Sequence, residues 1–185
     1  MPTPPKTSRA ELVAIALRLV EAEGTKALTV SAVAQQAGVK APSLYKHFAD
    51  RQALLKAVEL DVLDGLERVL RNQTKGKTPR QRLLSLAAVY RRFANAHPHR
   101  YEAIYSRDAF NDPELAAASR RAAEPLFEEL SAAGIAPERI LPMARTLTAF
   151  LHGFVSMEIV NAFRLGGDLD KDFAASLDTI LSEIG

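Results

Sequence analysis

"GVKAPSLYKHF", residues 38–48, is the stretch that decides the fold. Gly38 readily adopts the left-handed backbone conformation that ends a helix, and Pro42 fixes the first turn of the next helix without wasting a backbone donor. Leu44 and Phe48 are four residues apart and therefore share one face of that helix. The pattern predicts a short helix that starts near Pro42, runs through about Phe48 and buries this apolar pair.

The other side of this short helix is polar, because Ser43, Tyr45 and Lys46 project from it and His47 follows directly. Tyr45 and His47 can donate hydrogen bonds to phosphate oxygens, and Lys46 adds positive charge. Two short helices joined by such a turn have the form of a helix-turn-helix, whose second helix enters the DNA major groove. A plain helical corner with Tyr45 and Phe48 as packing aromatics explains the shape equally well, so shape alone leaves both interpretations open.

Cap residues mark the neighbouring helices. Ser8 and Glu11 form a capping box at the start of a first helix, and Thr29 caps a second helix that ends before Gly38. Asp50 caps a fourth helix. We therefore predict a compact three-helix head from which the fourth helix leaves as a connector.

The rest of the chain is also helical by its periodicity, with no alternating strand pattern and no internal repeat. Helices are expected over residues 79–95, 98–107, 113–134 and from about 170 onward, with a kink at Pro125. Residues 136–167 form one long, mostly apolar helix that starts fully only at Pro142. The predicted fold class is all-α, with a head over residues 1–55 and an all-helical body over residues 56–185.

Composition and charge bound the possible functions. The apolar fraction of 48% supports a buried core, and the absence of cysteine excludes disulfides and thiolate chemistry. Residues 1–60 hold eight Lys/Arg against five Asp/Glu, which is typical of a polyanion-binding segment, although ordinary surface charge explains so small an excess as well. No apolar stretch has the length of a signal peptide core or a membrane span. We expect a cytoplasmic protein with no membrane partner.

Catalytic and metal-binding motifs are missing from the sequence. It contains no G-x-S-x-G elbow, no phosphate-binding glycine loop and no H-E-x-x-H. His97 and His99 lack the i, i+4 spacing that places two ligands on one helix face, and we interpret them as surface turn residues. We predict no enzymatic activity, no metal and no cofactor.

The run "ALTVSAVAQQAGVKAPSLYKHFADRQALL", residues 27–55, resembles the DNA-binding head of the TetR family of bacterial transcription regulators. The resemblance implies a helix-turn-helix domain that binds a double-stranded DNA operator. It implies base contacts from Ala41, Pro42, Ser43 and Tyr45, and phosphate contacts from Thr29, Tyr45, Lys46, His47 and Arg51. Lys40 and Ala41 depart from the family pattern, since neither side chain can cap the short helix.

The same resemblance implies that the body binds a small-molecule effector and forms a homodimer through the last two helices. "LHGF", residues 151–154, is similar to a Trp-His-Gly signature found in a subgroup of the family, with Leu151 in place of the tryptophan. Candidate effector contacts are the residues Tyr90, Phe93, Tyr101, Tyr105, Phe110, Phe127 and His152. Aromatic residues at helical spacing more often belong to plain core, and a histidine in the place of His152 is more often a satisfied core histidine than a ligand contact.

These features together predict a ligand-responsive, TetR-like repressor that binds a palindromic operator as a dimer and is released by a small molecule. The alternative is a helical ligand-binding or enzymatic protein whose head no longer binds DNA. The small number of base-reading side chains keeps that alternative open, whereas the phosphate-binding residues argue against it.

Overall fold

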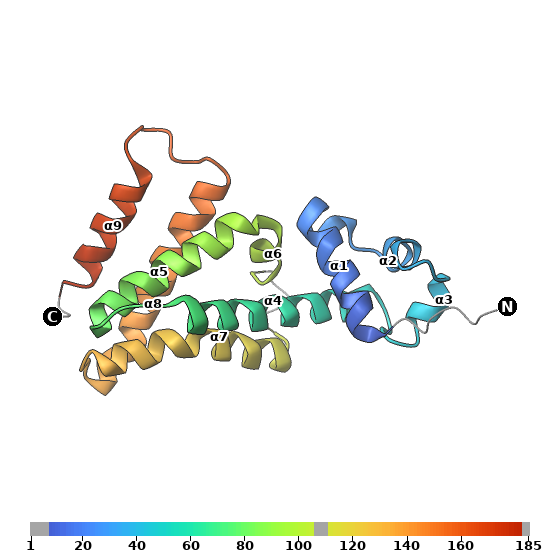
Figure 1. The fold of residues 1–185 in the computed structure, drawn as a ribbon, viewed down its shortest axis with the longest axis horizontal. Coiled ribbons are helices and arrows are strands. Elements are labelled where there is room, and N and C mark those ends of the chain that lie inside the picture. The colour runs from blue at the N-terminus through green and yellow to red at the C-terminus, as the bar shows by residue number, and fades with distance from the viewer. Residues whose placement is uncertain (1–7, 106–110, 183–185) are drawn as a thin grey trace. The chain divides into compact units, whose positions relative to one another are not determined.

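The computed structural model describes residues 8–105 and 111–182, and every regular element in that part of the chain is a helix (Figure 1). This confirms the predicted all-α fold. The elements are α1 (Arg9–Glu23), the 3-10 helix η1 (Thr25–Ala27), α2 (Val30–Gln36), α3 (Ala41–Leu44), α4 (Arg51–Gln73), α5 (Pro79–Ala96), α6 (Pro98–Ala103), α7 (Pro113–Ala132), α8 (Pro137–Ile159) and α9 (Leu169–Ile180).

Side-chain caps set the starts of most helices where the sequence predicts them. The Ser8 hydroxyl accepts a hydrogen bond from the Glu11 N–H at 3.2 Å, and the Glu11 carboxylate accepts one from the Ser8 N–H at 2.7 Å. The Asp50 carboxylate accepts from Ala53 N–H at 2.8 Å at the start of α4. Such caps satisfy the first N–H groups of a helix, which have no partner inside the helix itself.

The third helix is shorter than predicted, because regular α-helix ends at Leu44 and not near Phe48. The backbone N–H groups of His47 and Phe48 both bond to the Leu44 carbonyl, at 2.8 and 2.9 Å. This tightened turn leads directly to the cap of α4 at Asp50. The polar residues Tyr45 to His47 therefore lie on a turn that continues the helix.

The long helix α8 also differs from the prediction at both ends. It starts at Pro137, which takes the first helical position, and it continues through Pro142. It ends at Ile159, because Asn161 adopts a left-handed conformation with φ of 53°. The Asn161 and Ala162 N–H groups bond to the Glu158 and Met157 carbonyls, at 3.0 and 2.8 Å, which completes a Schellman end.

Packing divides the chain into two compact units. The first comprises the residues up to Gly65 together with His97–Ser119, and the second comprises Leu66–Ala96 with the residues from Arg120 onward. Helices α4 and α7 each contribute residues to both units. The boundary between residues 55 and 56 divides the chain by expected function and stays a prediction.

The first unit has its core between α1, α2, α3 and the start of α4, and α1 also packs against α6. Fully buried side chains fill this core, and each stabilises the folded state by about 1.5–3 kcal/mol through the hydrophobic effect. They include Leu12, Val20, Leu28, Leu44 and Leu54. The described helices include none that is long and apolar enough to cross a membrane.

The second unit is built on the packing of α5 against α8. Leu86, Leu130, Leu147 and Val155 are buried there, and an aromatic cluster joins α8 to the segment that follows it and to α9. Ring centroids in this cluster lie 4.8 Å apart for Phe154 and Phe163, 5.0 Å for Phe154 and Phe173, and 5.6 Å for Phe150 and Phe173. Such tilted and stacked pairs add to the stabilisation that burial alone provides.

One arginine ties three helices of this unit together. The Arg91 guanidinium on α5 lies 4.7 Å from the ring centroid of Phe173 on α9 and 5.4 Å from that of Phe154 on α8. It donates two hydrogen bonds to Glu158 on α8, at 2.9 and 2.5 Å, and contacts Asp170 on α9 at 2.8 Å. The planar guanidinium suits this combination of bidentate pairing and ring stacking.

The Glu158 carboxylate accepts hydrogen bonds from both Arg91 and Asn95. Hydrogen bonds from Arg91 lower the pKa of Glu158, burial opposes them, and a bond of 2.8 Å from Asn95 Nδ2 lowers the pKa further. The Arg91 and Glu158 side chains are only 15% and 17% exposed, so solvent screens their interaction weakly. Glu158 therefore stays ionised at neutral pH and holds Arg91 in place.

We expect Glu158→Gln to lower the free energy of unfolding by about 1–3 kcal/mol at neutral pH, through loss of charge-assisted hydrogen bonds. Because the folded pKa lies below the usual glutamate value, the stabilisation is complete above that value and is lost as pH falls through the folded pKa. Urea unfolding followed by circular dichroism at neutral and acidic pH measures both effects. The exposed Glu102→Gln is the control, and a deficit that did not shrink on acidification would contradict this assignment.

Candidate DNA-binding surface

The turn between α2 and α3 is shaped by a glycine in the left-handed region. Gly38 has φ of 66°, and its N–H bonds to the Gln35 carbonyl at 3.1 Å. The Val39 N–H bonds to the Ala34 carbonyl at 3.0 Å, which completes a Schellman end for α2. A residue with a side chain is strained at this φ, so the sequence correctly indicated where α2 ends.

The helix that follows has too few residues to be stable alone, and two buried side chains hold it in place. Leu44 is 0% and Phe48 2% exposed, which confirms the predicted apolar pair. The Arg9 guanidinium lies 5.0 Å from the centroid of the Phe48 ring and adds a cation–π contact. No side chain caps the N-terminus of α3 at Lys40, as the sequence predicts.

The residues predicted to contact DNA lie mostly on the exposed side of this element. Tyr45 is 57% exposed although it is a large aromatic residue, and Pro42, Ser43, Lys46 and His47 are exposed as well. Ala41, one position earlier, is half-buried. Because Leu44 and Phe48 fill the apolar side, the backbone presents these polar side chains to solvent without burying any of them.

Thr29 lies directly before α2 and caps it. Its hydroxyl oxygen accepts a hydrogen bond of 3.1 Å from the Ala32 N–H and thereby caps the helix. A threonine hydroxyl also carries one proton to donate, and the Thr29 side chain is exposed. The predicted phosphate contact is therefore compatible with the cap.

Arg51 is a predicted DNA contact whose guanidinium is hydrogen-bonded inside the head. Its Nε donates to the Leu28 carbonyl at 2.7 Å, and one terminal nitrogen donates to the Thr25 carbonyl at 2.6 Å. Both bonds are partly buried. The partners precede Arg51 by more than twenty residues, so no local pattern in the sequence could have indicated them.

The predicted effector contacts are distributed over both packing units. Tyr90 is buried on α5, and Phe93, Phe127 and His152 are half-buried in the same unit. Burial lowers the pKa of His152 and keeps its imidazole neutral at neutral pH. Two further tyrosines belong to the first unit, where the rings of Tyr101 and Tyr105 lie 5.1 Å apart. Phe110 lies outside the described residues.

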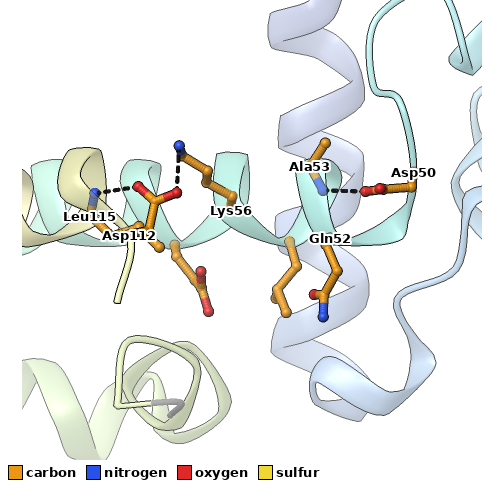
Figure 2. A pocket seen from close by; sticks show the side chains of 8 residues that line it. Asp50, Gln52, Ala53, Lys56, Asp112 and Leu115 are labelled. Atoms are coloured by element: carbon orange, nitrogen blue, oxygen red, sulfur yellow. Dashed lines mark hydrogen bonds and ion pairs between the residues drawn. The ribbon is translucent and has the colours of Figure 1, made fainter. Parts of the chain in front are cut away.

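An open pocket of about 380 Å³ lies in the first unit between the start of α4 and the start of α7 (Figure 2). The Lys56 ammonium lies 2.8 Å from both Asp112 and Glu114, and Figure 2 shows the Asp112 carboxylate between Lys56 and the Leu115 N–H that it caps. Hydrogen bonds with these partners raise the pKa of Lys56 and lower that of Asp112. The charges beside the pocket thus serve to fix α7 on α4.

His97 and His99 are half-buried, so the prediction that they are surface turn residues is wrong. They lie at the start of α6, which packs against α1. The Nδ1 atom of His97 lies 2.9 Å from the Glu21 carboxylate, and the His99 ring lies against Gly24. Across residues 8–105 and 111–182, no group of three His, Cys, Asp or Glu side chains is arranged to hold a metal ion.

An anchored short helix with an exposed polar face, at the end of a glycine turn, has the geometry of a helix-turn-helix. Residues 12–58 match the family described as bacterial regulatory proteins, tetR family, and residues 83–180 match the tetracyclin repressor-like C-terminal domain. The chain belongs to the TetR family and is a transcriptional regulator. Both matching families are regulators and neither is enzymatic.

A curated relative agrees with this assignment, and solved structures share the fold. The chain is 36% identical over 179 residues to the uncharacterized HTH-type transcriptional regulator Rv0681 of Mycobacterium tuberculosis, covering 96% of this chain and 80% of that protein. A protein of unknown function from Rhodococcus sp. RHA1 has the same fold, with a TM-score of 0.83 at 24% identity over 99% of both chains. A structure of BioQ with its double-stranded DNA operator also has this fold, with a TM-score of 0.69 at 22% identity over 96% of this chain and 98% of that one.

Proposed function

We propose that this protein is a homodimeric repressor that binds a palindromic DNA operator and is released from it by a small molecule. The observation that carries the proposal is the exposure of Tyr45, Lys46 and His47 on the turn that continues α3, whose other side is buried through Leu44 and Phe48. A head that had lost DNA binding would have no reason to keep a phenol, an ammonium and an imidazole side by side in solvent. This argues against a ligand-binding protein or enzyme with an inactive head.

In this proposal the exposed residues divide into two kinds of contact. Thr29, Tyr45, Lys46 and His47 bind phosphates, which fixes the orientation of the head without reading sequence. Base edges in the major groove are contacted by the start of α3. Ala41 and Pro42 offer only carbon atoms, which suit a thymine methyl group, while Ser43 and Tyr45 offer hydroxyl groups.

Dimerisation is assigned to α8 and α9, as the family resemblance implies. Solvent-exposed positions of α8 include Ala149, Gly153 and Met157, and Met157 is 44% exposed although it is apolar. Among the described residues, no atom lies within 4 Å of the point where a side chain on Gly153 would begin. Small residues on an exposed helix face allow another helix to approach closely, and a second copy of α8 meets that description.

The effector is assigned to the body, within the region that matches the tetracyclin repressor-like domain. Half-buried Phe93, Phe127 and His152 share one packing unit with Tyr90, and together they offer apolar surface with few polar groups. A neutral His152 favours an uncharged or largely apolar effector over a highly charged one. Tyr101, Tyr105 and Phe110 remain further candidates. Binding would change the spacing of the two heads, which must match successive major grooves about 34–36 Å apart.

Selection of duplexes from a random DNA pool by the purified protein tests the proposal directly. We expect enrichment of a palindrome whose half-sites are centred about one helical turn apart. A single half-site without symmetry would contradict the dimer, and no enrichment over a pool incubated without protein would contradict operator binding in the effector-free state.

We expect Lys46→Gln to weaken binding to the selected operator and to unrelated duplex by similar factors, because a phosphate contact carries no sequence information. The slope of log affinity against log salt should fall in magnitude by about 0.9, the value for one lost phosphate contact. Titration by fluorescence anisotropy at several salt concentrations measures both. Ser43→Ala is the matched control and should change operator preference while keeping the salt slope; an unchanged slope for Lys46→Gln would disprove the phosphate contact.

We expect Ala149→Glu to convert the dimer into a monomer of 20.2 kDa, because a charge on the exposed face of α8 would be buried against the second copy. Sedimentation equilibrium measures the mass. Ala88→Glu, an exposed alanine on α5, is the matched control and should leave the dimer intact. If both variants kept the mass of the wild type, the dimer interface would lie elsewhere.

A further inference from the structure

Arg51 occupies a position that is electrostatically unfavourable for a cation. It is the first residue of α4, where the partial positive charge of the helix dipole disfavours another positive charge. Asp50 immediately before it does not bond to its guanidinium but caps the helix through the Ala53 N–H. A cation at this place therefore needs strong interactions elsewhere to offset the unfavourable field.

Those interactions are two hydrogen bonds to backbone carbonyls in the segment before α2. Nε donates to the Leu28 carbonyl and a terminal nitrogen to the Thr25 carbonyl, at 2.7 and 2.6 Å. The Thr25 carbonyl also accepts a bond of 3.2 Å from the Leu28 N–H, which closes η1. Arg51 thus supplies charged donors to the carbonyl end of η1, where cations are favoured.

The contacted segment leads directly into the DNA-binding elements. Leu28 is 0% exposed, and the residue after it, Thr29, caps α2 with its hydroxyl and accepts the first helical bond of α2 from Val33 at 3.1 Å. Fixing the Leu28 carbonyl fixes one side of the peptide unit that joins Leu28 to Thr29. The orientation of α2 then follows from the start of α4.

We propose that Arg51 is a positioning residue for DNA binding, which holds the start of α2 against the start of α4, and that it does not serve as a phosphate contact. This rests on the proposed DNA-binding function of the head. Two N–H groups of the guanidinium are used within the head, and both bonds are partly buried. Because α3 follows α2 through the Gly38 turn, a shift of α2 would displace the whole DNA-binding face.

Charge-preserving substitutions separate positioning from phosphate binding. Lysine keeps the positive charge, but its single ammonium cannot reproduce the planar two-pronged donation of a guanidinium. We expect Arg51→Lys and Arg51→Gln to lose operator affinity by similar factors of about tenfold, which corresponds to one lost charge-assisted hydrogen bond, while both keep the wild-type salt slope. Lys46→Arg and Lys46→Gln form the matched pair: the arginine variant should bind like wild type, and the glutamine variant should lose about 0.9 from the slope.

The opposite pattern at residue 51 would overturn the proposal. If Arg51→Lys bound the operator like wild type and Arg51→Gln lost about 0.9 from the salt slope, Arg51 would be a phosphate contact equivalent to Lys46. Wild-type affinity in both variants would leave Arg51 with no part in DNA binding at all, and would overturn the proposal equally.

Amide hydrogen exchange of the free protein tests the positioning without DNA. We expect Arg51→Lys to accelerate exchange at the Ala32 and Val33 amides about tenfold, because both bond to Thr29, while amides in the middle of α1 keep their protection. Unchanged exchange at α2, or equal acceleration across α1, α2 and α4, would disprove local positioning. If wild-type protein bound no DNA, the proposed function would fail while this measurement would still decide what Arg51 holds.

Discussion

The head depends on one constraint: its third helix, α3, is a single turn and cannot be stable by itself. Forming the first turn of a helix costs more conformational entropy than its hydrogen bonds offset, so isolated short helices do not persist in water. Stability must come from tertiary contacts, and the sequence supplies them by placing Leu44 and Phe48 at the two ends of the turn, both almost fully buried. The exposed residues between them are then not required for packing, so their side chains are available for binding. The buried side of this short segment packs against the head, and its exposed side carries the polar residues.

In the body, one arginine holds three helices together. Helices α8 and α9 have one side packed inward and another side that is exposed to solvent. Arg91 reaches from α5 to Glu158 on α8 and Asp170 on α9, with its flat face against two phenylalanine rings. Two arginines, Arg51 in the head and Arg91 in the body, thus have the same structural use. Each joins segments that are far apart in sequence through several directed bonds from one rigid group.

How much of this was predictable depends on the range of the interactions. Caps such as Ser8, Thr29 and Asp50 act within three residues, and the helix starts that they set were predicted from local spacing. The start of α8 was placed wrongly at Pro142, because a proline inside a helix and one at its first position differ only in context that the sequence does not display. The hydrogen bonds and ion pairs of Arg51 and Arg91 were not predictable, since the partners lie 23 to 79 residues away along the chain. Exposure of Tyr45 to His47 followed from Leu44 and Phe48, so that part of the surface was correctly expected.

The chemistry of the residues that we propose to face DNA makes their geometry especially important. Ala41 and Pro42 present carbon atoms, and hydroxyl groups such as those of Ser43 and Tyr45 discriminate bases less strongly than bidentate side chains do. A head of this kind gains selectivity by holding weak contacts in fixed register and by pairing two heads at a set spacing, because small angular errors then remove many contacts together. In the proposed mode of binding, the buried anchors of α3 and the carbonyl contacts of Arg51 contribute to selectivity by holding the exposed residues in place. In this proposal, selectivity between DNA sequences depends on the rigidity of the head, because each exposed side chain by itself discriminates bases weakly.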